Sequence, residues 1–171
     1  YERNRFDFVT NGVALGGGSG NGVIKIENNV IISSDYFTDP LNVNGAVGST
    51  VRFNTLVNIG GVDMGANPLY CNANVYPTSN INAWHSSSAP VCALRYSLFD
   101  TTVGLQPGTG NHVGDPSTFF ADLDRVDLHL APSSPAKQAG EPGTDLSTDI
   151  EGNPRPNPAA SAPDVGAYEA P

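Results

Sequence analysis

The sequence is short of positive charge. Its 171 residues include only 8 lysines and arginines against 17 aspartates and glutamates, so the formal net charge at pH 7 is −9. Nucleic acids and anionic membranes both attract basic protein surfaces, because their phosphate groups must be neutralised. Neither is therefore an expected partner. No run of 18 apolar residues occurs either, and we expect no membrane-spanning segment.

Histidine and cysteine are also scarce. The three histidines lie far apart, and no His or Cys spacing resembles a zinc site. His85 precedes three serines, but no Gly-X-Ser-X-Gly sequence surrounds them, so Ser-His-Asp catalysis is not expected. The only two cysteines, Cys71 and Cys92, form either one disulfide or two buried free thiols.

Acidic residues are concentrated in residues 100–171. Two groups of carboxylates could be considered for calcium: Asp122, Asp124 and Asp127, and Asp145, Asp149 and Glu151. Neither group has the full spacing of a calcium-binding loop. Asp122 and Asp127 are also explained as side chains that accept backbone N–H groups in turns. We expect no cofactor, with calcium as the alternative.

Short apolar runs separated by polar residues recur along the first two thirds of the chain. The clearest are residues 23–32 and 51–57, with weaker versions at 69–75 and 93–99. Asn28, Asn54, Asn72 and Tyr96 mark these runs at an irregular interval of about two dozen residues. The pattern predicts a solenoid in which short strands pair in parallel between coils, with asparagines at the bends bonding from coil to coil. An antiparallel β-sandwich is the alternative, since it also needs short strands and turns.

Residues 115–171 carry an ordered series of turn-rich motifs. In order these are Asp115-Pro116, Phe119-Phe120-Ala121-Asp122, Asp127-Leu128-His129-Leu130, Ser133-Ser134-Pro135-Ala136, Ala139-Gly140, Asp149-Ile150-Glu151-Gly152-Asn153-Pro154-Arg155-Pro156 and Asp164-Val165-Gly166-Ala167-Tyr168-Glu169. Frequent Pro, Gly, Asn and Asp leave no room for a long helix. The series resembles the C-terminal end of bacterial β-helix-repeat proteins of the choice-of-anchor Q type.

This resemblance implies an all-β chain that folds as a right-handed parallel β-helix. Residues 1–114 would form the coils with their loop insertions, and residues 115–171 an irregular C-terminal capping segment of the same domain that covers one end of the stack. The family is found outside the cytoplasm, which favours a secreted or cell-surface location and a Cys71–Cys92 disulfide. It has no single activity, so fold and function must be argued separately.

Aromatic residues near the loop insertions are the candidate ligand-binding residues. Residues 35–49, 60–68 and 76–90 are the longest such insertions. The aromatic and histidine side chains expected to contact a glycan are Trp84, Tyr76, His85, Tyr70 and Tyr36. Trp84 and the tyrosines could stack against the apolar face of a sugar ring, or Trp84 could instead be a packing plug.

The sequence predicts a non-catalytic, extracellular structural or adhesive module with a carbohydrate as a candidate partner. Residues 1–9 read as an uncapped strand that could pair with another chain, so the chain is either a self-assembling subunit or the last part of a longer β-helix. The alternative function is a polysaccharide lyase or glycoside hydrolase. That alternative would require Arg52, Arg95 and a carboxylate to meet in one groove beside Trp84.

Overall fold

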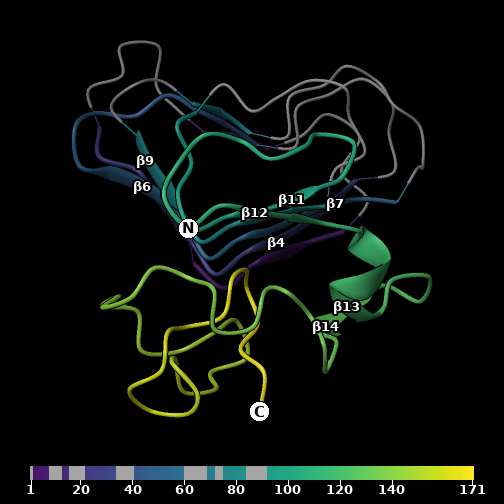
Figure 1. Ribbon diagram of the computed structural model, residues 1–171. Helices are drawn as coiled ribbons and strands as arrows, with labels where there is room; N and C mark the ends of the chain where they lie inside the picture. Colours follow the sequence, from purple (N-terminus) through teal and green to yellow (C-terminus); the bar gives the residue numbers. More distant parts are fainter. Residues whose placement is uncertain are drawn as a thin grey trace.

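The computed structural model describes residues 2–7, 13–15, 22–33, 41–59, 69–71, 75–83 and 92–171. These residues form short β-strands and one 3₁₀-helix, Pro116–Thr118. The largest sheet is parallel and has six strands in the order β1 (Arg5–Phe6), β4 (Val30–Ser33), β7 (Thr55–Asn58), β10 (Ile81–Ala83), β11 (Leu98–Asp100) and β12 (His112–Gly114). The strands lie nearly on top of one another in Figure 1.

Two further parallel sheets have three strands each. One contains β3 (Lys25–Glu27), β6 (Ser49–Arg52) and β9 (Val75–Thr78), and the other β2 (Val13–Leu15), β5 (Leu41–Val43) and β8 (Tyr70–Cys71). The chain visits the sheets in turn, so β3, β4 and β5 are followed one repeat later by β6, β7 and β8. From β1 to β7, each strand therefore pairs with the strand three places along the chain, and β10, β11 and β12 then pair in succession. This parallel pairing is compatible with the predicted β-helix and excludes the antiparallel sandwich for these sheets.

A left-handed backbone residue turns the chain between adjacent sheets. Asn28, Phe53, Ser79 and Tyr96 have φ between 45° and 55°, and Arg3 has φ of 55° at the equivalent place before β1. The left-handed conformation costs a residue with a Cβ about 1–2 kcal/mol. Its recurrence at the same bend means that the packing on both sides of the bend compensates for this cost.

The residue after each bend forms a ladder of side-chain hydrogen bonds through the stack. Its members, which we call the asparagine ladder, are Asn4, Asn29, Asn54, Asn80, Ser97 and Asn111. Both the main-chain N–H and the side-chain amide of Asn29 donate to Oδ1 of Asn54, at 3.0 Å each, and Asn54 repeats this toward Asn80. The ladder thus satisfies buried polar groups in every repeat.

The predicted asparagine bonds are confirmed, but one of the four predicted markers, Asn54, needs correction. Asn28 and Tyr96 are the left-handed bend residues, whereas Asn54 lies one position later and belongs to the ladder. Asn72 lies outside the described residues. The bend and the ladder are therefore two adjacent positions, which a single marker residue could not separate.

The strands bury side chains on both faces. One cluster gathers residues from all three sheets and fills the space between them: Ile26, Ile31, Leu41, Val43, Val51, Leu56, Leu69, Cys71, Val75, Leu94 and Phe99. A second cluster joins the opposite face of the six-stranded sheet to the C-terminal segment: Val30, Ile32, Val57, Ile81, Ala83 and Leu98, with Phe119, Phe120, Leu128, Ala136, Val165, Ala167 and Tyr168. The sheet is thus covered on both sides.

The C-terminal segment does not sit on an end of the stack, as we expected, but along its side. Figure 1 shows this green-to-yellow segment beneath the six-stranded sheet. Its backbone bonds to three successive repeats: Thr148 O accepts from the Asn28 amide, Ala167 N donates to Thr55 Oγ1, and Gly166 N donates to Ser79 O. Within it, β13 (Phe120–Asp122) and β14 (Asp127–Leu130) form an antiparallel hairpin. The outer face of the six-stranded sheet is apolar, and burying it beneath the C-terminal segment is favourable.

Buried carboxylates hold the rest of this segment in shape. Asp149 accepts the main-chain N–H groups of Glu151, Asn153 and Glu169, and Asp164 accepts those of Gln138 and Ala170. These bonds replace the ladders that a regular strand or helix would supply. Both aspartates belong to the motifs that the sequence singled out, so those motifs encode a folded turn structure.

A buried ion pair lies at the centre of the same segment. Arg155 Nε is 3.4 Å from Glu169 Oε2, and neither side chain is exposed to solvent. Arg155 donates to the carbonyl oxygens of Asp164 and Gly166, and its guanidinium lies 4.3 Å from the centroid of the Phe53 ring. Burial raises the pKa of Glu169 to about 7, against the opposite effect of the Arg155 charge.

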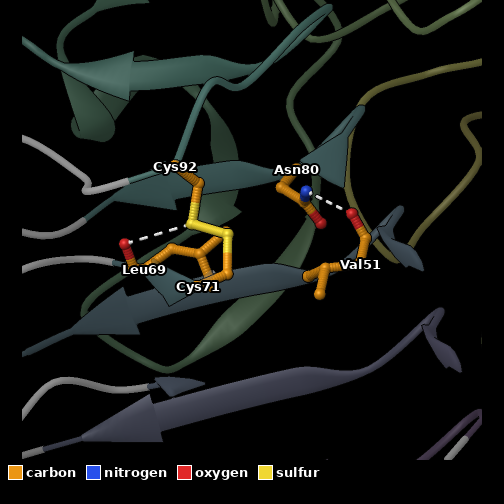
Figure 2. Close-up of a disulfide and its surroundings, with 5 residues drawn as sticks. All are labelled: Val51, Leu69, Cys71, Asn80 and Cys92. Carbon is orange, nitrogen blue, oxygen red and sulfur yellow. Dashed lines mark hydrogen bonds between the residues drawn. A yellow bond between two sulfur atoms is a disulfide. The ribbon is translucent and has the colours of Figure 1, made fainter. Parts of the chain in front are cut away.

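The predicted disulfide joins Cys71, at the end of β8, to Cys92. The bond closes a 21-residue separation, which in the chain-entropy treatment corresponds to about 3 kcal/mol of stabilisation. Figure 2 shows the disulfide near the ladder residue Asn80, whose amide donates to Val51 O. Cys92 Sγ also lies 3.6 Å from Leu69 O, a contact rather than a hydrogen bond because a disulfide sulfur carries no proton.

Two asparagines of similar burial are predicted to respond oppositely to replacement by valine. Asn54→Val should lower the free energy of unfolding by about 3 kcal/mol, because it leaves the Asn29 donors and the Ile26 carbonyl without partners. Asn82→Val should leave it unchanged or raise it by about 1 kcal/mol, because Asn82 Oδ1 is buried without a partner. Urea unfolding of both variants checks this, and equal losses would contradict the ladder's role.

Stability should depend on pH through Glu169. Its pKa in the folded protein lies above the ordinary value of 4.5, so the folded state retains a proton that the unfolded state releases. The associated stability is present below pH 4.5 and is lost as pH rises to 7, by about 3 kcal/mol in total. Glu169→Gln should remove this slope, which urea unfolding from pH 4 to 8 measures. Parallel curves for the two proteins would refute the assignment.

Candidate functional site

Charged side chains form a row across the sheet of β3, β6 and β9. Its consecutive cross-strand neighbours are Glu2, Glu27, Arg52, Thr78 and Arg95. We call this row, together with Tyr76, Glu141 and Asp145 beside it, the arginine face. Arg52 and Arg95 occupy the same row of the sheet, where a single residue, Thr78, separates them.

Arg52 is held between two carboxylates. Its Nε donates to Glu27 Oε1 at 2.7 Å, and its Nη1 donates to Asp145 of the C-terminal segment. The hydrogen bond and charge of Arg52 lower the pKa of Asp145, so this carboxylate is ionised at neutral pH. A general acid for glycoside hydrolysis needs the opposite shift. The arrangement ties the C-terminal segment to the sheet.

Tyr76 lies in strand β9 and not in a loop, which corrects the predicted insertion at residues 76–90. Its hydroxyl donates to Glu141 Oε1 at 2.7 Å and accepts from Arg95, whose guanidinium lies 5.1 Å from the ring centroid. Burial, followed by the bond to Glu141, raises the pKa of Tyr76. One face of the ring is therefore already occupied by Arg95.

A second region lies where the parallel strands of the six-stranded sheet end. Two adjoining cavities of about 330 and 340 Å³ share Asn58 and Leu123. We call them together the strand-end groove; its lining residues are Asn58, Ile59, Ala83, Asp100, Thr101, Thr102, Asp115, Pro116, Ser117, Leu123, Asp124 and Val126. The groove lies between the carboxyl ends of β7, β10 and β11 and the hairpin of β13 and β14.

Carboxylates and hydroxyls line the strand-end groove beside apolar side chains. Asp100 Oδ1 accepts the N–H and hydroxyl of Thr102, and Asp115 Oδ1 accepts Ser117 N at the start of the 3₁₀-helix. The hydrogen bonds from Ser117 lower the pKa of Asp115. Asp124 is exposed at the rim. Such a mixture of fixed acceptors, hydroxyls and small apolar patches matches the hydroxyl groups and C–H faces of sugars.

The predicted glycan-contacting residues do not form one described platform. Trp84, His85 and Tyr36 lie outside the described residues. Tyr70 belongs to β8 and Tyr76 to β9, which are strands of different sheets. Ala83, the residue immediately before Trp84, lines the strand-end groove. Arg52 and Arg95 lie on one face together with carboxylates, but the pocket beside Arg52 and Asp145 is not lined by Arg95. Because Trp84 lies outside the described residues, the required groove beside Trp84 stays a prediction.

A cluster around His129 was not foreseen from the sequence. Its ring nitrogens contact Asp127 Oδ1 and, at 3.2 Å, Glu151 Oε1, and its ring centroid lies 4.6 Å from that of Tyr168. Burial lowers the pKa of His129, but the bonds to Asp127 and Glu151 outweigh it, so the net shift is upward. Arg5 donates to the Tyr168 hydroxyl and so joins β1 to this cluster. Only the i,i+2 spacing of Asp127 and His129 could have signalled it.

The carboxylates proposed for calcium mostly bind protein donors. Asp122 accepts from Arg125 N, Asp127 from His129 N, and Asp145 from Arg52, so the expected turn-capping role of Asp122 and Asp127 is confirmed. Within the described residues, no group of three or more His, Cys, Asp or Glu side chains could hold a metal ion. Calcium binding stays a prediction.

Comparisons of this chain with protein-family models, with curated proteins and with solved structures give no match. In the described part of the chain, no helix has the length and apolar character needed to cross a membrane.

Proposed function

We propose that this chain is a right-handed parallel β-helix of the choice-of-anchor Q type that acts as a non-catalytic, extracellular structural or adhesive module and contacts carbohydrate at the strand-end groove. The observation that carries the proposal is the groove itself, a hollow lined by carboxylates, hydroxyls and apolar side chains at the edge where the parallel strands end. The β-helix is supported by the three sheets visited in turn and by the asparagine ladder. Right-handedness follows the general rule for parallel crossovers.

Location outside the cytoplasm is supported by the disulfide between Cys71 and Cys92. Disulfides persist in oxidising compartments and are rare among cytosolic proteins. The acidic surface is consistent with a soluble module that does not bind anionic polymers.

Carbohydrate is the favoured ligand because of the groove's functional groups and volume. Its exposed carboxylate and hydroxyls, from Asp115, Thr101 and Ser117, can accept and donate hydrogen bonds to sugar hydroxyls. Each cavity is at the lower end of the size range of small-ligand sites, which suits one or two sugar rings. Ala83 lines the groove, and the next residue in the sequence, Trp84, is the candidate for stacking on a sugar ring.

A polysaccharide lyase or glycoside hydrolase is the second candidate, favoured by the row of Arg52 and Arg95. Both arginines are engaged, Arg52 by Glu27 and Asp145 and Arg95 by Tyr76. A lyase would need one of them free to remove a proton from the substrate. Binding without turnover is therefore the preferred function.

Two aromatic substitutions separate the groove from the arginine face. Trp84→Ala should weaken binding to a recognised polysaccharide at least tenfold, and Asp124→Ala should weaken it further by removing a rim acceptor. Tyr76→Ala, which alters only the arginine face, should leave the affinity unchanged. Glycan-array screening followed by titration calorimetry measures these affinities.

Three outcomes would count against this function. Absence of binding across plant, algal and bacterial polysaccharides would refute the carbohydrate proposal. Loss of binding in Tyr76→Ala alone would move the site to the arginine face. Release of reducing ends or of unsaturated sugars would identify an enzyme.

A further inference from the structure

The six-stranded sheet has an edge strand at each end. β1 pairs only with β4, and β12 pairs only with β11, among the strands that the structure describes. An edge strand presents main-chain N–H and C=O groups that can pair with another chain. The two edges belong to one continuous parallel sheet, so they face opposite directions along the stack.

The asparagine ladder gives these two edges complementary chemistry. In every link the donor is the earlier residue and the acceptor is the side-chain oxygen one repeat later, from Asn4 through to Asn111. At the β1 end, Asn4 Oδ1 receives no hydrogen bond from any described residue. At the β12 end, the main-chain N–H of Asn111 donates to no described residue. The first ladder residue, Asn4, thus offers an acceptor, and the last, Asn111, offers a donor.

The main chain is bonded in the opposite sense, with the later residue as donor and the earlier residue as acceptor. Val30 N donates to Asn4 O, Thr55 N to Asn29 O, and so on to His112 N, which donates to Ser97 O. The next member of this series would be Arg5 N of a second copy donating to Asn111 O. The donors and acceptors of the β12 edge are therefore complementary to those of the β1 edge of a second copy. The two strands can pair in parallel without a change in backbone conformation.

We propose that copies of this chain stack head to tail, with β12 of one copy pairing in parallel with β1 of the next. The inference rests on the proposed β-helix and extends it by naming the partner as a second copy. Because this contact does not close on itself, repeated addition builds a filament.

Side chains at the two edges support the same register. Phe6, Ile31, Leu56, Asn82, Phe99 and Val113 are successive neighbours in one row of the sheet. Val113 ends this row and is 41% exposed. Stacking would place it against Phe6 of the next copy, so that an exposed apolar side chain becomes buried.

The contact should be weaker than the contact between two internal repeats. The side-chain amide of Asn111 already lies within hydrogen-bonding distance of the carbonyl oxygens of Leu94, Gln106 and Pro107, so only the main-chain N–H remains for the ladder. Charged residues at the other edge, Glu2, Arg3, Arg5 and Asp7, limit indiscriminate pairing. Assembly should accordingly be reversible and depend on concentration.

The first test compares two valine-to-lysine variants by sedimentation velocity over a range of concentrations. Val113→Lys should weaken association at least tenfold, because a lysine would have to be buried against Phe6. Val47→Lys is the matched control, since Val47 is 79% exposed and lies outside both edge strands. Association of Val113→Lys at the wild-type level would overturn the proposal.

The second test uses complementary blocked edges. Arg5→Pro removes the N–H that would bond to the next copy, and the main-chain contact of Asn4 O with β4 remains. Each variant alone should associate at least tenfold more weakly than the wild type, but an equimolar mixture of Arg5→Pro and Val113→Lys should form a dimer that grows no further, because one open edge of each kind remains. Thermal melting verifies that each variant is folded.

Two results would refute head-to-tail stacking and spare the proposed function. If Val113→Lys dimerises alone while Arg5→Pro does not, the contact is β1 with β1. If the wild-type chain stays monomeric at millimolar concentration but still binds polysaccharide, the edges do not pair, and the glycan-binding proposal stands. If filaments form but the chain binds no polysaccharide, the glycan-binding proposal is refuted and head-to-tail stacking stands.

Discussion

The asparagine ladder is the interaction on which the rest of the fold depends. At each bend the chain leaves one sheet for the next, and its main-chain groups can no longer join a regular strand ladder. Asn29, Asn54 and Asn80 supply the missing partners from inside the stack, with each side chain serving the repeat before it. The same bonds fix the register of successive repeats, since a slip of one residue would bury an unsatisfied amide. This register also sets which residues are neighbours on the arginine face and at the strand ends that border the groove.

The C-terminal segment converts a polar sequence into a rigid covering. It contains little regular structure, but Asp149 and Asp164 each accept several main-chain N–H groups, and Arg155 pairs with Glu169 in the interior. Part of the acidic excess of this segment is therefore structural and is not available to ligands. The remainder, including Asp115 and Asp124, borders the strand-end groove. The distribution of burial decides which carboxylates can act in binding.

The two charged surfaces differ in what their side chains bind. On the arginine face, Arg52 and Tyr76 bind Asp145 and Glu141 and so fasten the C-terminal segment to the sheet. In the strand-end groove, exposed carboxylates and hydroxyls such as those of Asp115 and Ser117 line a hollow together with apolar side chains. Side chains that tie two segments together suit a structural role, whereas a hollow lined by exposed polar and apolar groups suits recognition.

Much of the local structure could be predicted from the sequence. Alternating apolar and polar residues indicated the strands, their recurrence indicated parallel pairing between repeats, and two cysteines allowed the single disulfide. These features depend on nearest neighbours and on period, which a linear pattern contains. The division of the bend into a left-handed residue and a ladder residue was missed, because Asn28 and Asn29 are chemically identical in the sequence and differ only in backbone conformation.

Only the tertiary structure decided where the C-terminal segment lies and which charged groups meet. Its place along the side of the six-stranded sheet follows from the apolar outer face formed by Val30, Val57, Ile81 and Leu98, residues drawn from four separate repeats. His129 meets Glu151, and Arg52 meets Asp145, across separations of 22 and 93 residues that no motif spans. The sequence by itself determined the strands, their repeat and the turn-rich ending. The contacts between distant residues required the chain to fold first, because they depend on which faces remain uncovered once the strands have stacked.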